Sequence, residues 1–418
     1  MAAQRVKLVT QNLAALIGGL LIAALVLELG LRLLLYGGLA WEHSHLPPLV
    51  REPDPATGWH LAANQRAAER TLDYQSVVTT NADGLRGPRY PHEPDEGEFT
   101  IVLLGDSYME ATHVPEEQAF FRLLERELGE GFRVVNLGVG GFGTVQAWRQ
   151  FEVRGKNYRP NLVLLGFYPE NDVYNNSAEL SRVMWGEDNP RYFSAPFVEV
   201  DDSGVLQVVP PQYARATAAH EEQRARYSPL LHWLDQFTHS TVEDVYKATL
   251  AKIRPKVNTP GQDPNIHLGV YIEDFNPSSN YEGTLDPAGY AKAWDAAWHY
   301  TEAVLGRLQD DVVSGGAQFA LFSIPSKLQS EARYEKAVSK AYPDLQLDLD
   351  RPNARIAAMC EQRKIPFLDL LPDFRQEISD GKVLSHQRGS SHWNAEGHAL
   401  AARQVATWLR DSGLLSKR

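Results

Sequence analysis

A serine and a histidine far apart in the chain are the residue types needed for a nucleophile and its general base. Ser107 follows Gly105 and Asp106 at the end of an apolar run, and His392 lies in the C-terminal stretch Ser390–His398, SSHWNAEGH. An imidazole with a reference pKa of about 6.5 is mostly neutral at pH 7, so it can take a proton from a serine hydroxyl and return it to a leaving group. Gly-Asp-Ser is also an ordinary turn sequence and a histidine can be structural, so neither residue predicts catalysis alone.

Two other segments could stabilise the oxyanion that forms when a serine attacks a carbonyl carbon. The stretch Asn136–Gly143, NLGVGGFG, has glycines whose N–H groups can approach a ligand without a Cβ in the way. The stretch Phe167–Val173, FYPENDV, includes Asn171, whose side-chain amide could donate to the same oxygen. A helix N-terminus beside Ser107 would offer further unpaired N–H groups and a partial positive charge. A plain turn and an N-cap are the alternative uses of these two stretches.

A parallel sheet with helices on both faces is expected to position these residues, because short apolar runs alternate with amphipathic ones. Strands are predicted at Thr100–Leu104, Arg133–Leu137, Leu162–Gly166, Gln318–Ile324 and Pro366–Leu370. Helices are predicted near Glu117–Leu128, Thr144–Val153, Pro287–Leu308, Asn353–Arg363 and Ala395–Leu409. Ligands of such doubly wound sheets bind beyond the carboxyl ends of the strands, where Ser107 and the two loop stretches fall.

The third and fourth predicted strands are separated by far more residues than one crossover helix needs. An inserted segment at about 174–286 is therefore expected. Within it, Phe197–Val209 predicts a hairpin around Asp-Asp-Ser-Gly, and Tyr227–Lys252 predicts a helix. The turn-rich stretch Val257–Gly283 is a candidate active-site lid.

The N-terminus predicts a membrane anchor. Leu13–Leu27 has no charge, and continuing the apolar run to Tyr36 gives about 24 residues, enough for the roughly 30 Å of hydrocarbon in a bilayer. Arg5 and Lys7 precede this run, so the positive-inside rule keeps the N-terminus in the cytoplasm and sends the rest of the chain outward. A cleaved signal peptide and a buried amphipathic helix are the alternatives.

Three segments of the chain are expected to differ in role. Residues 1–40 are the anchor, residues 41–98 are a proline-rich linker with irregular elements that pack on the edge of the domain, and residues 99–418 are the catalytic domain with its insertion. This predicts a single-pass inner-membrane protein with its catalytic domain in the periplasm.

Taken together, the four polar segments resemble the motif blocks of the SGNH/GDSL hydrolase family. The blocks are matched by Gly105-Asp106-Ser107, by Asn136-x-Gly138-x-x-Gly141, by Asn171-Asp172 and by the residues around His392. The resemblance implies a flavodoxin-like, three-layer α/β/α sandwich with a five-stranded parallel sheet. It also implies that Ser107 is the nucleophile and an oxyanion donor, that Gly141 and Asn171 are the other donors, and that His392 is the base.

More narrowly, the chain resembles the membrane-anchored envelope members of that family. The matching residues are Glu28–Leu33 at the end of the N-terminal helix and Asn81, Gly84, Arg86 and Gly87 before the sheet. One position departs from the family pattern, which has an aspartate two or three residues before the histidine. Here Ser390 and Gly389 stand there, and loss of that acid costs a triad enzyme about 10⁴ in rate. Another carboxylate, a backbone carbonyl or a Ser-His dyad are the alternatives that the sequence leaves open.

Composition excludes several classes of function. The net charge of −12 with scattered Lys and Arg argues against nucleic-acid binding, and the single cysteine, Cys360, rules out an internal disulfide and a cysteine-based metal site. No histidine has the partners of a zincin helix, so neither a metal nor another cofactor is expected. Tyr290, Trp294 and Trp298 recur along one helix face, where core packing is favoured over a sugar platform.

The leading hypothesis is a membrane-tethered serine esterase that removes O-acyl groups, acetyl above all, from an envelope glycan or a related small ester. The alternatives are an O-acyltransferase in polysaccharide acetylation, working with envelope polysaccharide machinery, and a non-catalytic glycan-binding scaffold in which the missing aspartate reflects lost hydrolysis.

Overall fold

The computed structural model describes a defined set of residues. These are residues 12, 15–20, 22–23, 25–27, 30, 46–71, 73–201, 203–226, 268–272, 285, 287–343, 346–387 and 390–416. The helix expected at Tyr227–Lys252 and most of the candidate lid at Val257–Gly283 lie outside them.

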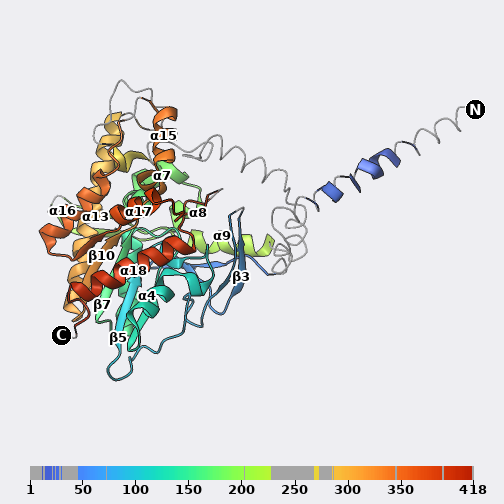
Figure 1. Cartoon of the computed structure of the whole chain (residues 1–418). Coiled ribbons are helices and arrows are strands. Elements are labelled where there is room, and N and C mark those ends of the chain that lie inside the picture. The colour runs from blue at the N-terminus through green and yellow to red at the C-terminus, as the bar shows by residue number, and fades with distance from the viewer. Residues whose placement is uncertain are drawn as a thin grey trace, which may run out of the picture.

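A five-stranded parallel sheet forms the centre of the domain (Figure 1). Its strands are β5 (Phe99–Leu104), β6 (Phe132–Asn136), β7 (Leu162–Phe167), β10 (Gln318–Ser323) and β11 (Phe367–Asp369). The spatial order is β11-β10-β7-β5-β6, so the chain steps outward in opposite directions from β5. This is the flavodoxin-like order, and all five predicted strands are confirmed to within two residues at either end.

Helices cover both faces of the sheet because the strand side chains alternate between two apolar cores. From β5, Ile101 and Leu103 join one core, while Val102 and Leu104 join the other. Helices α4 (Phe120–Leu128), α17 (Leu371–Ser379) and α18 (Ala395–Asp411) contribute to the first core. Helices α5 (Thr144–Val153), α13 (Pro287–Ser314) and α16 (Arg351–Arg363) contribute to the second. The three-layer sandwich is thus confirmed, and Figure 1 shows α4 beside α18.

The aromatic residues along α13 belong to the second core. Tyr290, Trp294 and Trp298 are all buried among its side chains. The sequence interpretation of these residues as core packing is confirmed, because a buried ring offers no face to a sugar.

The segment before the sheet is more regular than expected. It forms two antiparallel hairpins, one from β1 (Arg51–Asp54) and β2 (Gly58–Leu61), the other from β3 (Arg66–Arg70) and β4 (Gln75–Thr79). The prediction of irregular structure was wrong here, because prolines were taken to interrupt the segment. In fact Pro53 is paired with Trp59 within the first hairpin, where strands of four residues tolerate it.

Short elements carry the chain between β7 and α13 and around β10. They are α6 (Pro169–Asp172), α7 (Ala178–Trp185), α8 (Pro190–Ser194), β8 (Phe197–Val200), β9 (Leu206–Val209), α9 (Tyr213–Arg226), α14 (Lys327–Ser330) and α15 (Ala332–Ala341). The described residues also include 3₁₀ turns at Glu116–Gln118, Gly155–Tyr158, Tyr174–Asn176 and Gly269–Tyr271. Strands β8 and β9 confirm the predicted hairpin, and α9 packs against β1 of the first N-terminal hairpin.

The transmembrane helix expected from the sequence lies partly outside the described residues. Of the stretch Leu13–Tyr36 the structure describes only residues 15–20, 22–23, 25–27 and 30. No helix among the described residues is both long and apolar enough to cross a bilayer.

Candidate active site

Ser107 is the first residue of the short helix α3 (Ser107–Glu110), which follows β5. The turn between them requires glycine at position 105, where φ is +151° and a Cβ would lie 2.5 Å from Met109 Cγ. Asp106 caps the helix, since its Oδ1 accepts a hydrogen bond of 2.9 Å from the Tyr108 N–H. This turn places the hydroxyl of Ser107 at the carboxyl edge of the sheet, as the sequence predicted.

His392 lies within hydrogen-bond distance of Ser107. The distance from Ser107 Oγ to His392 Nε2 is 2.7 Å. The histidine precedes α18, whose N-cap is Asn394 through a 3.0 Å bond from the Gly397 N–H. Two residues from opposite ends of the domain therefore meet with the geometry of a nucleophile and its general base.

The imidazole of His392 stacks on one ring, contacts a second at a tilt and is held neutral. Its centroid lies 4.5 Å from that of His113 and 4.9 Å from that of Tyr108. Burial, together with the nearby His386 and Lys327, lowers the pKa of His392 to about 4. A neutral imidazole at pH 7 can accept the proton of a serine hydroxyl.

A second buried histidine pair supports this stack. His113 Nε2 lies 2.8 Å from His398 Nε2, and His398 Nδ1 accepts the N–H of Phe120 at 3.2 Å. Because that Nδ1 is an acceptor, His398 carries its proton on Nε2 and donates it to His113. Burial lowers the pKa of both side chains well below the usual value, so both are neutral. Among the described residues, no group of His, Cys, Asp or Glu has the arrangement of a metal site.

The other ring nitrogen of His392 contacts a hydroxyl where the family pattern has a carboxylate. Ser390 Oγ lies 3.0 Å from His392 Nδ1. Asp380, an acidic residue upstream of His392, accepts a hydrogen bond from Gln376 at the end of α17. Position 389 lies outside the described residues.

The three predicted oxyanion donors line the same cleft as the nucleophile. Asn171 donates one N–H to Asp106 Oδ2 at 2.8 Å, which leaves its second N–H for a ligand. Gly141 has a φ of +83°, a conformation that favours glycine. Among the described residues, no acceptor takes the backbone N–H of Gly141 or that of Ser107. The geometry thus leaves an N–H free on each of the three residues.

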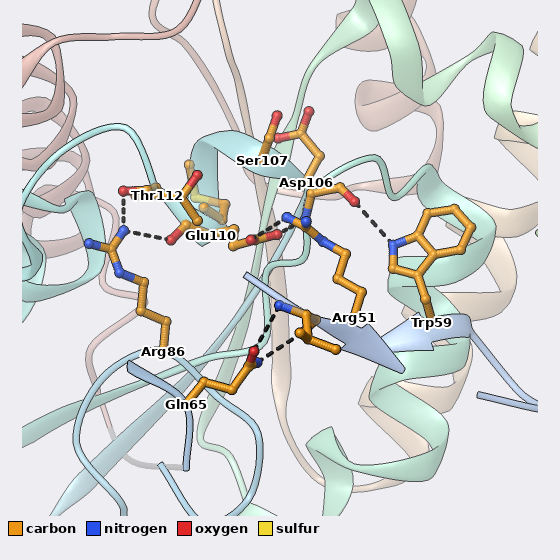
Figure 2. A network of polar contacts seen from close by, with 12 residues as sticks. Arg51, Trp59, Gln65, Arg86, Asp106, Ser107, Glu110 and Thr112 are labelled. Carbon is orange, nitrogen blue, oxygen red and sulfur yellow. Dashed lines mark hydrogen bonds and ion pairs between the residues drawn. The ribbon is translucent and has the colours of Figure 1, made fainter. Parts of the chain in front are cut away.

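The first N-terminal hairpin fixes the loop that holds Gly141 (Figure 2). Arg51 of β1 pairs with the buried Glu110 at 2.5 Å, and Glu110 in turn accepts the N–H of Gly140. Trp59 of β2 donates its indole N–H to the carbonyl of Gly140 at 3.1 Å. Both backbone groups of Gly140 are therefore engaged, which sets the orientation of the next peptide.

The turn at residues 81–87, before the sheet, contacts helix α3 through Arg86. Arg86, which is buried, donates to the carbonyls of Glu110, Ala111 and Val114. Ala111 has a φ of 57° at the end of α3, so these bonds stabilise a left-handed C-cap. Figure 2 shows Arg86 approaching α3 from the side opposite Trp59.

Two buried carboxylates lie beneath Asn171. Burial raises the pKa of Asp106, and burial together with Asp106 raises that of Asp172 well above its usual value. Asp172 Oδ2 accepts the N–H of Tyr168 at 2.6 Å. Asp172 binds the backbone of the loop after β7, and Asp106 binds Asn171 and the start of α3. Neither acid hydrogen-bonds to the imidazole of His392 among the contacts of the described residues.

The cleft above these residues has a volume of about 740 Å³. Its walls come from the N-terminal hairpins and from the segment inserted after β7, through Arg51, Trp59, Trp185, Arg191 and His220. The predicted linker, residues 41–98, and the predicted insertion at about 174–286 thus both contribute to the walls of the cleft. A cavity of this size accommodates a drug-sized molecule or a short stretch of a polymer.

Sequence reasoning missed residues that act from other loops. The histidine loop is the segment before α18 that contains His386, Ser390 and His392. His113, Lys327 and Asp73 all contact this loop, and none of the three is part of a local motif. Ser390 carried a signal, since its position two residues before His392 is that of the expected acid. Glu110, four residues after Asp106 in an apolar stretch, also carried a signal, because a buried carboxylate requires a cationic partner. That partner is Arg51.

No protein-family profile matches the sequence, and no curated protein matches it. Thirty-seven chains among solved structures match the fold. One is the acetyl xylan esterase AlAXEase, with a TM-score of 0.35 and 11% identity over 75% of this chain and 99% of that chain. Another is a GDSL-like lipase from Bacteroides thetaiotaomicron, with a TM-score of 0.33 and 11% identity over 76% of this chain and 91% of that chain. A third is a catalytic mutant of an acetylxylan esterase from Geobacillus stearothermophilus, with a TM-score of 0.36 and 12% identity over 77% of this chain and 99% of that chain. Likenesses of this size transfer no property to the chain.

Proposed function

We propose that this protein is a serine esterase of the SGNH/GDSL type that removes O-acyl groups, acetyl above all, from a glycan. The observation that carries the proposal is the 2.7 Å contact between Ser107 Oγ and Nε2 of the neutral His392. The four motif blocks of the sequence support it, because the side chains they supply line one cleft.

The reaction follows from the positions of these groups. Ser107 Oγ attacks the ester carbonyl carbon while its proton passes to His392 Nε2. The N–H groups of Ser107, Gly141 and Asn171 stabilise the oxyanion, each contributing about 2.7–4 kcal/mol in the transition state. Collapse expels the sugar alkoxide, which takes the proton from His392 and leaves an acyl-serine. Water then gives a proton to His392 as it attacks the acyl carbon. Collapse breaks the bond to Ser107 Oγ, which takes that proton back from His392, and the carboxylic acid leaves.

The cleft favours a sugar ester over a long-chain lipid. Its lining residues include the aromatic Trp59 and Trp185 together with polar residues such as Asn175 and Gln223. Mixed walls of this kind suit sugar rings, which have both hydroxyl groups and apolar faces. An acetyl group is small enough to lie beside Ser107 while the sugar occupies the rest of the 740 Å³.

We also propose that the N-terminal segment tethers the catalytic domain to the outer face of a bacterial inner membrane. Support comes from the uncharged run Leu13–Leu27 and from the exposure of its described apolar side chains. Leu16, Leu20 and Ile22 are 60%, 62% and 65% exposed. A tethered chain should stay with the membranes after carbonate extraction at high pH. Its catalytic domain should also be digested by protease added to intact spheroplasts. Recovery in the soluble fraction would contradict it.

The esterase proposal is tested with the full chain and p-nitrophenyl acetate. Ser107→Ala should lose at least about a thousandfold in kcat with its circular dichroism unchanged. A matched control is Ser314→Ala, at the exposed end of α13 away from the cleft, which should retain wild-type turnover. Equal turnover in wild type and Ser107→Ala would refute the assignment. Transfer of acetyl to an added sugar in excess of hydrolysis would make the chain an acyltransferase instead.

A further inference from the structure

The structure of the histidine loop bears on how the base works without its expected acid. We propose that the hydroxyl of Ser390 positions the imidazole of His392, and that Asp73, from the second N-terminal hairpin, holds Ser390 in place. The inference deepens the proposed function, on which it rests, by assigning a positioning residue and its support to the same site.

The first step is the protonation pattern of the ring. For His392 to accept the hydroxyl proton of Ser107, its Nε2 must be bare, so the single proton of the neutral ring is on Nδ1. Ser390 Oγ, 3.0 Å from Nδ1, is then the acceptor of that proton. The same oxygen accepts the backbone N–H of His392 at 3.2 Å. Ser390 therefore fixes both the backbone and the ring tautomer of the base.

The second step is the support of Ser390 itself. Asp73 Oδ2 accepts the Ser390 N–H at 2.9 Å, and Asp73 Oδ1 accepts the N–H of Gln387 at 2.9 Å. On the other side, Lys327 Nζ donates to the carbonyl of Ser390 at 2.9 Å and to the carbonyl of His386. Both backbone groups of Ser390 are thus bound to charged side chains, and such charge-assisted bonds are the stronger ones.

The third step concerns the charge that faces the ring. The titratable side chains that pack around His392 are Tyr108 and His113 from α3 and the loop after it, together with His386, His398 and Lys327. The carboxylate of Asp73 accepts from the backbone of the loop and is connected to the imidazole only through Ser390, by two hydrogen bonds in sequence. The imidazolium formed during the reaction therefore has a neutral hydroxyl as its partner at Nδ1. This predicts a base that is well oriented but weak.

Three substitutions at position 390 separate orientation from charge. Ser390→Ala removes the acceptor, so kcat should fall about tenfold with KM unchanged, as expected for one lost hydrogen bond. Ser390→Thr keeps the hydroxyl and should retain activity near that of the wild type. Ser390→Asp places a carboxylate beside Nδ1 and should move the acidic limb of the kcat/KM profile up by one pH unit or more.

These variants are measured in the full chain with p-nitrophenyl acetate between pH 3.5 and pH 8, after near-ultraviolet circular dichroism has shown that each is folded. A wild-type kcat in Ser390→Ala would overturn the inference, as would an acidic limb that does not move in Ser390→Asp. If Ser390→Ala fails to fold, the contrast between Ser390→Thr and Ser390→Asp still decides, because only the second adds charge.

A spectroscopic readout keeps this inference separate from the proposed function. Nitrogen-15 NMR of the imidazoles, assigned by comparison with His392→Gln, should show the wild-type His392 protonated on Nδ1 at pH 7. In Ser390→Ala the preference for that tautomer should be lost. If the wild type hydrolyses no ester, the proposed function fails while the tautomer still reports on Ser390. A wild-type ring protonated on Nε2 would overturn the inference whatever the activity.

Discussion

The two sides of the cleft hold their functional groups by different means. On the nucleophile side, carboxylates are engaged directly, since Glu110 pairs with Arg51 and Asp106 accepts the amide of Asn171. On the base side, the imidazole of His392 contacts two rings and the hydroxyl of Ser390. Negative charge therefore holds the predicted oxyanion donors in place, while no carboxylate among the described residues hydrogen-bonds to the ring.

This difference has a consequence for the reaction. A carboxylate next to an imidazole raises its pKa and stabilises the imidazolium in the transition state. With burial as the main influence, the pKa of His392 is instead about 4, so the base remains ready to accept a proton in mildly acidic solution. His392 is therefore a weaker base than an imidazole paired with a carboxylate, while the N–H groups on the other side of the cleft are held in place.

The largest effect is expected from a substitution of the general base on the base side of the cleft. His392→Gln removes the proton acceptor of Ser107 and should lower kcat for p-nitrophenyl acetate by about 10²–10⁴, the usual contribution of a general base. Steady-state kinetics with the purified full chain measures it. A loss of less than tenfold would mean that Ser107 is not activated through the 2.7 Å contact.

The next largest effect is expected from a substitution of an oxyanion donor on the nucleophile side of the cleft. Asn171→Ala removes one oxyanion donor and should lower kcat by about 10²–10³ with little change in KM. Because Asn171 also donates to Asp106 Oδ2, the comparison variant is Asp106→Asn, which removes that acceptor but keeps the N-cap acceptor. It measures the cost of losing the contact alone and should lower kcat less than Asn171→Ala. If Asn171→Ala changes KM alone, the amide binds substrate and does not stabilise the oxyanion.

A third effect concerns the stability of the base side and has a defined sign. The pKa of His392 falls from 6.5 to about 4 on folding, so its stabilisation is complete above pH 6.5 and is lost as the pH falls through 4. This loss is roughly 3 kcal/mol at the acid end. Relative to the wild type, His392→Gln should therefore gain about that much in free energy of unfolding between pH 7 and pH 4. Denaturant titrations at each pH give the difference, and parallel curves for the two proteins would contradict it.

The smallest effect tests the ion pair that supports the oxyanion loop. Arg51→Met leaves Glu110 buried without its cation and should lower the free energy of unfolding by about 2 kcal/mol, less than for a fully buried pair because the Arg51 side chain is 35% exposed. Adding Glu110→Gln should recover part of the loss. Urea denaturation midpoints of the single and double variants measure the coupling, and additive effects would show that the pair does not matter.

The sequence predicted the central sheet because its strands are apolar runs with a helical segment after each. The residues of β5 and β7 are buried throughout, so composition alone identifies them. The strands β3 and β4 gave no such signal, because RAAER and QSVVT contain polar residues and gain their stability from packing on the domain.

The positions of Ser107 and His392 could be predicted because each follows or precedes a recognisable element. Their surroundings could not. Asp73 and Lys327 reach the histidine loop from segments far away in sequence, through backbone groups that carry no sequence signature. The same holds for the contact of Trp59 with the carbonyl of Gly140. Such contacts depend on how loops converge, which local pattern does not determine.

The most direct measurement is labelling of the full chain with a fluorophosphonate, followed by peptide mapping. A serine activated by His392 should be phosphonylated, giving one adduct on the peptide that contains Ser107 and a much slower reaction in His392→Gln. An unlabelled protein, or an adduct on another residue with Ser107 untouched, would contradict the account of this cleft as the active site of a serine esterase.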